Sequence, residues 1–175
     1  NYTTFEMYPS EVAALVPILK LKDRTVVDPA CGTRTIESVL SEHCGCNVVS
    51  FDICPKFGNS INLFANEEWR HLLSYRWGVC VLSPPWEAAD LFILKCLEHA
   101  VCVCAHVSGD WYTNAPAWRL QWLAQYTVLS LPLPFLEPGQ HTRRRRAQWL
   151  VLGPRRSSLR RVVRLANLNS LTYKV

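Results

Sequence analysis

The chain has 175 residues and a mass of 20.0 kDa, with 49% hydrophobic and 19% charged residues, so we expect one domain with a hydrophobic core and exclude a largely disordered chain. No apolar run reaches the ~20 residues of a membrane span, no leader precedes the first helix, and the start at Asn1 suggests an excised domain without membrane contact. The net charge of +5 is uneven: residues 1–137 hold nine Lys/Arg and all fourteen acids, whereas residues 138–175 hold ten Lys/Arg and no acid.

Helices and strands are expected to alternate along the chain. The spacing of apolar residues and the breaker residues between them predict helices over 9–21 (starting at Ser10), 33–43, 87–100 and 115–126, and strands over 25–29, 47–53, 78–86, 101–107, 127–132 and 147–154. The strands are continuously apolar, which is typical of a mostly parallel sheet covered on both faces. The sequence therefore predicts an α/β domain of Rossmann-like type, followed by a segment over 155–175 that is either a basic amphipathic helix or an extension.

Eight cysteines raise the questions of disulfides and metal binding. Most of them lie inside apolar helix-like or strand-like runs, which favours free thiols in a reducing intracellular compartment. The pairs Cys44/Cys46 and Cys102/Cys104 are separated by one residue, whereas most zinc sites have two to four. We therefore expect no metal site.

Polar residues lie at the carboxyl ends of three of the predicted strands, where ligands of open parallel sheets bind. The first group is the turn from Asp28 to Thr33, the second is Asp52, and the third is the loop from Ser83 to Trp86. Asp52 lies 20 positions after Gly32, a spacing that suits an acid binding ribose hydroxyls. Either acid could instead cap the helix that follows it.

The third group, Ser83-Pro84-Pro85-Trp86, is the most informative. Proline has no amide hydrogen, so the carbonyls of Ser83 and Pro84 are free to accept from a ligand, and the tryptophan offers a face for stacking. Such a loop suits a planar ring that bears an amine, although a rigid turn with a core tryptophan is the structural alternative.

The combination of "DPACGT", an acid after the next strand, and "SPPW" resembles the S-adenosylmethionine-dependent amino-methyltransferases, which methylate adenine N6 or cytosine N4 in DNA or RNA. The resemblance covers residues 5 to about 153, because "FEMYPSEVA" resembles the family's N-terminal cofactor motif. It implies the Rossmann-like class I methyltransferase fold, with a seven-stranded sheet, over residues 1–154, and it leaves 155–175 as a basic C-terminal extension.

The resemblance also implies site residues and a cofactor. The catalytic loop would be Ser83, Pro84, Pro85 and Trp86, with Ser83 Oγ and the Pro84 carbonyl accepting the amine hydrogens and Trp86 stacking on the base. S-adenosylmethionine would be bound by Tyr8, Pro9, Asp28, Pro29, Ala30, Gly32, Thr33, Asp52 and Ile53. A base inside a duplex would first be flipped out.

Three features depart from the family pattern. Arg34 stands where the family has a second glycine, no clear acid follows the expected third strand apart from Glu67/Glu68, and serine replaces the more frequent Asp or Asn of the catalytic loop. Serine is usual among the cytosine-N4 enzymes, which slightly favours cytosine. Glycine is required at position 34 only if φ is positive or the cofactor touches Cα. Arg34 with ordinary angles could meet phosphate or the cofactor carboxylate, or it could fill the pocket.

The basic end predicts nucleic acid as the partner. Nine arginines lie between 143 and 164, and we expect phosphate contacts from Arg143, Arg144, Arg145, Arg146, Arg155 and Arg156. A solvated surface run or a targeting signal would have the same composition. No stretch is long enough for a separate target-recognition domain, so target choice would come from loops, from the structure of an RNA, or from a protein partner that could be obligatory. Trp111 and Tyr112 could line a base pocket, and buried core aromatics are an equally good interpretation of them.

Two other functions are consistent with parts of the sequence. A catalytically degenerate methyltransferase-like scaffold, with Arg34 blocking the pocket, could bind RNA, a ribonucleoprotein or a partner methyltransferase subunit. A nicotinamide-dependent oxidoreductase fits less well, because the turn lacks G-x-G-x-x-G and "SPPW" would have no role.

Overall fold

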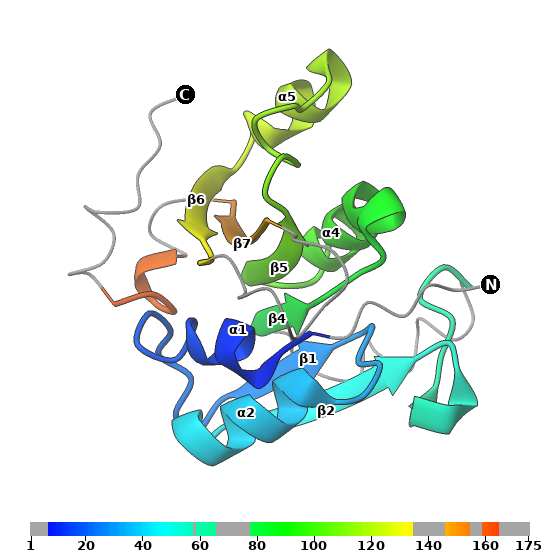
Figure 1. The fold of residues 1–175 in the computed structure, drawn as a ribbon, viewed down its shortest axis with the longest axis vertical. Coiled ribbons are helices and arrows are strands. Elements are labelled where there is room, and N and C mark those ends of the chain that lie inside the picture. The colour runs from blue at the N-terminus through cyan, green and yellow to red at the C-terminus, as the bar shows by residue number, and fades with distance from the viewer. Residues whose placement is uncertain (1–6, 58, 66–77, 135–145, 155–158, 165–175) are drawn as a thin grey trace.

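The strands form one mixed sheet with helices on both faces (Figure 1). The computed structural model describes residues 7–57, 59–65, 78–134, 146–154 and 159–164. The strands are β1 Thr25–Asp28, β2 Asn47–Asp52, β3 Asn59–Ser60, β4 Val79–Leu82, β5 Cys102–Ser108, β6 Thr127–Pro132 and β7 Ala147–Gly153. The helices are α1 Pro9–Ala13, α2 Thr35–Cys44, α4 Ala89–Leu97 and α5 Ala117–Leu123, with short 3₁₀ turns η1 Pro55–Phe57 and η2 Trp86–Ala88.

The strand order is β3-β2-β1-β4-β5-β7-β6. The pairs from β3 to β5 are parallel, whereas β7 is antiparallel to both of its neighbours. The predicted α/β sheet with helices on both faces is therefore confirmed, and its parallel part holds β1, β2 and β4 side by side. Their carboxyl ends carry the three polar groups identified from the sequence, which consequently share one edge of the sheet.

Alternation along the strands divides the core into two layers. Val79 and Val81 pack in one cluster with α1 and α2, whereas Cys80 and Leu82 belong to a second cluster with α4 and with Leu123 at the end of α5. Figure 1 shows α1 and α2 together over β1 and β2. Since successive side chains of a strand point to opposite faces, the odd positions of β4 all face α1, and Ser83 continues that series.

The first helix is shorter than predicted. The sequence predicts a helix over 9–21, but α1 ends at Ala13 and turns lead to Ile18. Pro17 explains the difference, because a proline cannot donate to the helix ladder and its ring clashes with the carbonyl four residues earlier, that of Ala13. The start is at Pro9 rather than Ser10, with proline at the first helical position and Glu11 Oε2 accepting from the Tyr8 amide at 2.9 Å.

Part of the segment assigned to the C-terminal extension packs into the domain. Leu159, Val162 and Val163 are buried against the α1 and α2 layer. Two backbone hydrogen bonds tie this segment to the chain before β1: Lys20 N to Val162 O at 2.6 Å and Arg164 N to Ile18 O at 2.8 Å. Residues 159–164 therefore pack against the same core layer as α1 and α2.

Candidate functional site

The turn after β1 is held by its own polar groups and by the end of β2. Asp28 Oδ1 accepts from the Ala30 amide at 3.2 Å, and the Gly32 amide donates to Asp52 Oδ2 at 2.9 Å. Asp52 Oδ1 accepts from the Cys54 amide at 2.9 Å, so both of its oxygens already bind backbone. Each carboxylate oxygen has a second lone pair, and Asp52 is therefore still able to accept from a hydroxyl.

Asp28 is a buried carboxyl group among other acids. It is fully buried, and Oδ2 has no hydrogen-bond partner among the residues that the structure describes. Burial raises the pKa of Asp28 well above its ordinary value; the Ala30 amide opposes this, and the nearby Asp52 and Glu37 carboxylates raise the pKa further. A cationic group bound at this turn would relieve that repulsion.

The surroundings of Gly32 leave room at the turn. Gly32 has φ +47°, and apart from its chain neighbours no described heavy atom lies within 4 Å of the position that a Cβ would take. Cys31, by contrast, is buried, and burial raises the pKa of its thiol to about 12, so the thiol is neutral at physiological pH. Ile53 is 52% exposed beside Asp52, whereas Pro29 is buried. The turn after β1 and the neighbouring end of β2 thus combine acids, open space and an exposed apolar side chain.

Arg34 has the backbone conformation that glycine favours. Its φ is +61°, in the left-handed region, where a non-glycine residue costs roughly 1–2 kcal/mol. The side chain is 47% exposed; Nε donates to Phe57 O at 2.8 Å, and Nη1 lies 3.8 Å from Glu37 Oε2. Arg34 therefore connects the turn after β1 with η1 after β2. Position 34 thus has the positive φ that is one of the two conditions under which glycine would be preferred there.

The catalytic loop predicted from the sequence begins where β4 ends. Ser83 and Trp86 are half-buried, Pro84 is buried and Pro85 is exposed at the entry to η2. Because β4 pairs with β1 in parallel, this loop and the Asp28 turn lie at neighbouring carboxyl ends. The structure therefore brings the predicted catalytic and cofactor residues to one edge of the sheet.

Two buried residues beside Ser83 were missed by the sequence analysis. Ser83 Oγ lies 3.3 Å from Nδ1 of His106 on β5, and Nε2 of His106 lies 3.3 Å from Oε1 of Glu11 on α1. Glu11 also connects to the N-terminal motif, through the bond from the Tyr8 amide, and its backbone carbonyl accepts from Trp149 Nε1 at 2.8 Å. Glu11 and His106 come from segments 95 positions apart, so only a pairing of α1 with β5 in three dimensions could reveal them.

The loop after β5 is braced by an arginine on α5. Arg119 donates to Asp90 of α4 at 2.8 and 2.5 Å and to Trp111 O at 2.7 Å, and its guanidinium lies 4.2 Å from the centre of the Trp111 ring. Trp111 is buried and Tyr112 is half-buried. Trp111 is therefore one of the buried core aromatics that the sequence allowed as an alternative to a base pocket.

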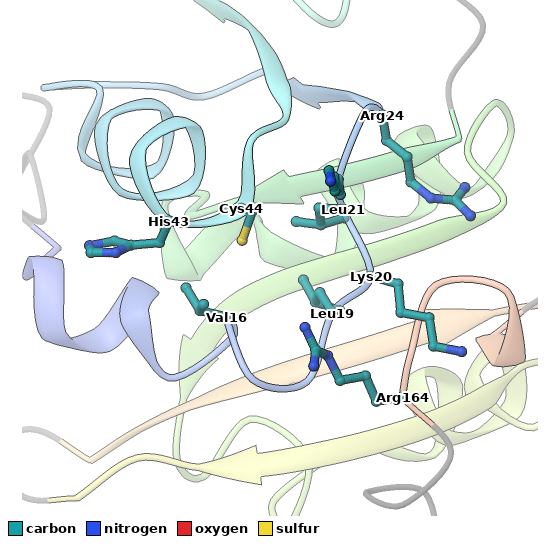
Figure 2. Close-up of a pocket in the computed structure, with 9 residues that line it drawn as sticks. Val16, Leu19, Lys20, Leu21, Arg24, His43, Cys44 and Arg164 are labelled. Atoms are coloured by element: carbon teal, nitrogen blue, oxygen red, sulfur yellow. The ribbon is translucent and has the colours of Figure 1, made fainter.

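The basic end is described only in part. Arg143, Arg144, Arg145, Arg155, Arg156 and the acids Glu67/Glu68 lie outside the described residues, and Arg146 is exposed next to β7. A pocket of about 420 Å³ lies at the opposite edge of the sheet, lined by basic residues before β1, by the end of α2 and by Arg164 (Figure 2). Lys20, Lys22, Arg24 and Arg164 supply its positive charge.

Disulfides, metal sites and membrane-spanning helices are all absent from the described part of the chain. All eight cysteines are free, and no group of His, Cys, Asp or Glu within the described segments is arranged to hold a metal ion. Among the helices of the described residues, none has the length and apolar composition that crossing a membrane requires.

The raised pKa of Asp28 leads to a prediction about stability. A carboxyl group with a raised pKa in the folded state stabilises the fold below its ordinary pKa, and that stabilisation is lost as the pH rises through the raised value. Between the two values the wild type should lose up to ~1.4 kcal/mol per pH unit relative to Asp28→Asn, which does not titrate. Urea unfolding of both proteins from pH 4 upward measures the difference, and a constant difference would contradict a raised pKa.

Comparison with known proteins gives the fold. No protein-family model and no curated protein matches the sequence. Among the similar solved structures is precorrin-6y C5,15-methyltransferase from Geobacter metallireducens, with 12% identity and a TM-score of 0.60, where the match covers 87% of this chain and 90% of that one. The 23S rRNA methyltransferase ErmE has 12% identity and a TM-score of 0.56, with 90% of this chain and 75% of that one covered. M. capricolum TrmK in complex with S-adenosyl-homocysteine has 11% identity and a TM-score of 0.53, with 86% of this chain and 69% of that one covered. The protein therefore has the Rossmann-like fold that these methyltransferases share.

Proposed function

We propose that this protein transfers a methyl group from S-adenosylmethionine to the exocyclic amino group of a base, adenine N6 or cytosine N4, in DNA or RNA. The observation that carries the proposal is the loop Ser83-Pro84-Pro85-Trp86 at the carboxyl end of β4, beside the acidic turn at the end of β1. The methyltransferases that share the fold support it: ErmE is a 23S rRNA methyltransferase, and TrmK was solved with S-adenosyl-homocysteine.

The residues present suit the cofactor. S-adenosylmethionine, when bound, supplies an electrophilic methyl group on a cationic sulfur. Asp28 has a buried Oδ2 without a described partner, and the space beside Gly32 is open, so the turn suits a cationic and hydroxyl-bearing ligand. Asp28 and the Gly32 turn would hold the methionine part, and Asp52 the ribose.

The catalytic loop would make the amine nucleophilic and align it. The lone pair of an exocyclic amine is delocalised into the base, so acceptors on its two hydrogens are needed to localise that pair on nitrogen. Ser83 Oγ and the Pro84 carbonyl are such acceptors, and the half-buried Trp86 offers a ring for stacking. Holding nitrogen, methyl and sulfur in line contributes the remaining rate enhancement.

Incubation with labelled S-adenosylmethionine and pools of DNA and RNA, followed by nucleoside mass spectrometry, tests the proposal directly. N6-methyladenosine or N4-methylcytidine, or their deoxy forms, is the expected product. Label on another atom of the base, or on no nucleic acid at all, contradicts it.

Arg34 favours a second candidate, a methyltransferase-like scaffold that binds RNA or a protein partner without catalysis. Its side chain joins the turn after β1 to Phe57 O, across the two loops that a cofactor would contact. Calorimetry separates the candidates: binding of S-adenosylmethionine by the unmodified protein supports the enzyme. Absence of binding at millimolar cofactor, with recovery in Arg34→Gly, supports the scaffold.

The basic pocket provides a test of nucleic-acid binding. The chain from Tyr8 to Leu21 runs from the catalytic edge to the pocket, so phosphates bound there would belong to a strand that follows this side of the protein. Lys20→Glu combined with Arg164→Glu is expected to weaken binding by about tenfold or more at low salt and to reduce the salt dependence of the affinity.

The control for that variant is Lys95→Glu, which also reverses a positive charge. Lys95 lies on α4 and does not line the pocket. Fluorescence anisotropy with labelled RNA and DNA at several salt concentrations measures both affinity and slope. Equal slopes for the pocket variant and the wild type would show that the pocket does not bind phosphate.

A further inference from the structure

His106 is a buried polar side chain on the face of the sheet that packs against α1 and α2, where most of the core residues are apolar. The neighbouring residues of β5 on the same face, Cys102 and Cys104, pack with α1 and α2, and His106 is the next in that series. Its side chain is 1% exposed and that of Glu11 is 5% exposed. A buried histidine beside a buried carboxylate is less stable than a well-packed apolar pair of similar volume. A role beyond packing is therefore indicated.

The position of His106 is set by the sheet and by two aromatic rings. Leu82 of β4 is paired with Ala105 of β5, which brings the residue after each, Ser83 and His106, together. The His106 ring lies 5.2 Å from the Trp149 ring and 6.1 Å from the Trp86 ring, measured between ring centres. The imidazole is thus held by packing with one nitrogen toward the catalytic loop and the other toward α1.

The contacts of the two ring nitrogens determine the tautomer. Nε2 lies 3.3 Å from the Glu11 carboxylate, at ion-pair distance although outside hydrogen-bond geometry, and a carboxylate favours the proton on the nearer nitrogen. Nδ1 is then an acceptor, and the group 3.3 Å from it is the Ser83 hydroxyl. The hydroxyl of Ser83 must donate to Nδ1, which leaves the lone pairs of Oγ for another donor.

We propose that His106, held in the Nε2-protonated tautomer by Glu11, orients the Ser83 hydroxyl so that Oγ accepts a hydrogen from the target amine. His106 and Glu11 are positioning residues, since they act through Ser83. This inference rests on the proposed methyl transfer. It adds a chemical link between the N-terminal motif, where Glu11 accepts from the Tyr8 amide, and the catalytic loop.

A double-mutant cycle tests the role of His106. His106→Leu is expected to lower kcat by roughly ten- to a hundredfold, with the affinity for S-adenosylmethionine and the KM for nucleic acid changed by less than about threefold. In a Ser83→Ala background the same change should lower kcat no further. Multiplying losses in the double variant would overturn the proposal, because they would show that His106 does not act through Ser83.

Two further variants separate orientation from packing. His106→Asn has an amide oxygen near the position of Nδ1 and can still accept from the Ser83 hydroxyl, so it should recover most of the rate that His106→Leu loses. An Asn variant as slow as the Leu variant would contradict the proposal. His99→Leu, on a histidine outside the site, is the control and should retain the wild-type rate.

The tautomer itself is measurable without catalysis. Nitrogen-15 NMR of the unmodified protein should show a protonated Nε2 and an unprotonated, hydrogen-bonded Nδ1 for His106, and a protonated Nδ1 would overturn the inference. This measurement also serves if a His106 variant fails to fold. If the unmodified protein methylates no nucleic acid, the proposed function fails, whereas the NMR result still decides the arrangement of Ser83, His106 and Glu11.

Discussion

Ser83→Ala is expected to lower the rate of methyl transfer by roughly a hundredfold or more while the affinity for S-adenosylmethionine stays unchanged. The change removes the only side-chain oxygen of the catalytic loop that we assign to the target amine and leaves the Pro84 carbonyl in place. No polar atom of the turn from Asp28 to Gly32 hydrogen-bonds Ser83 Oγ among the described contacts, so the cofactor turn should be unaffected.

The measurements are single-turnover methylation and calorimetry with the cofactor. Ser41→Ala is the matched control, because Ser41 is exposed on α2 and the same atoms are removed. A Ser83→Ala rate within about threefold of the wild type would refute the assignment of Ser83. Loss of cofactor affinity in parallel with the rate would instead place Ser83 in the cofactor site.

Arg119→Ala is expected to destabilise the protein by about 3–5 kcal/mol. The side chains of Arg119 and Asp90 are 14% and 11% exposed, so removing the guanidinium leaves a mostly buried carboxylate without its partner. The change also removes the hydrogen bond to Trp111 O and the stacking on the Trp111 ring. The loop after β5 would keep the ring contact between Trp111 and Trp122 of α5 but would lose the polar part of its contact with that helix.

Urea unfolding measures this effect, and a second variant identifies its cause. Arg119→Ala combined with Asp90→Ala removes the unpaired charge and should be more stable than Arg119→Ala alone. Lys95→Ala breaks the exposed pair between Lys95 and Glu98 and should cost no more than about 0.5 kcal/mol. If the double variant is no more stable than the single, packing against Trp111 rather than the ion pair is the main contribution.

The sequence was informative about the elements and less so about their ends and directions. The four helices and six longer strands in the described part of the chain were predicted near their observed positions, because each has a local pattern of apolar residues bounded by Gly, Pro or polar turns. β3, with two residues, is too short to show periodicity. The antiparallel direction of β7 depends on pairing with β5 and β6, which no local pattern encodes.

The candidate site shows the same division. Asp28, Asp52 and Ser83 lie at the ends of predicted strands and could be assigned to one edge of the sheet because parallel strands end together. Arg34 stood out in the sequence, but its positive φ and its bond to Phe57 O could be known only from the fold. A short sequence motif does not determine the backbone angles of its residues, nor which distant loop a long side chain contacts.

The sequence alone determined the alternation of helices and strands, the acidic turn, the double-proline loop and the separation of charge, because these features depend on neighbouring residues. The tertiary structure decided which distant residues meet: Glu11 with His106, His106 with Ser83, and Leu159 to Val163 with the first core layer. Such contacts depend on strand order and helix packing, and buried polar residues look like ordinary members of an apolar run until their partners are known.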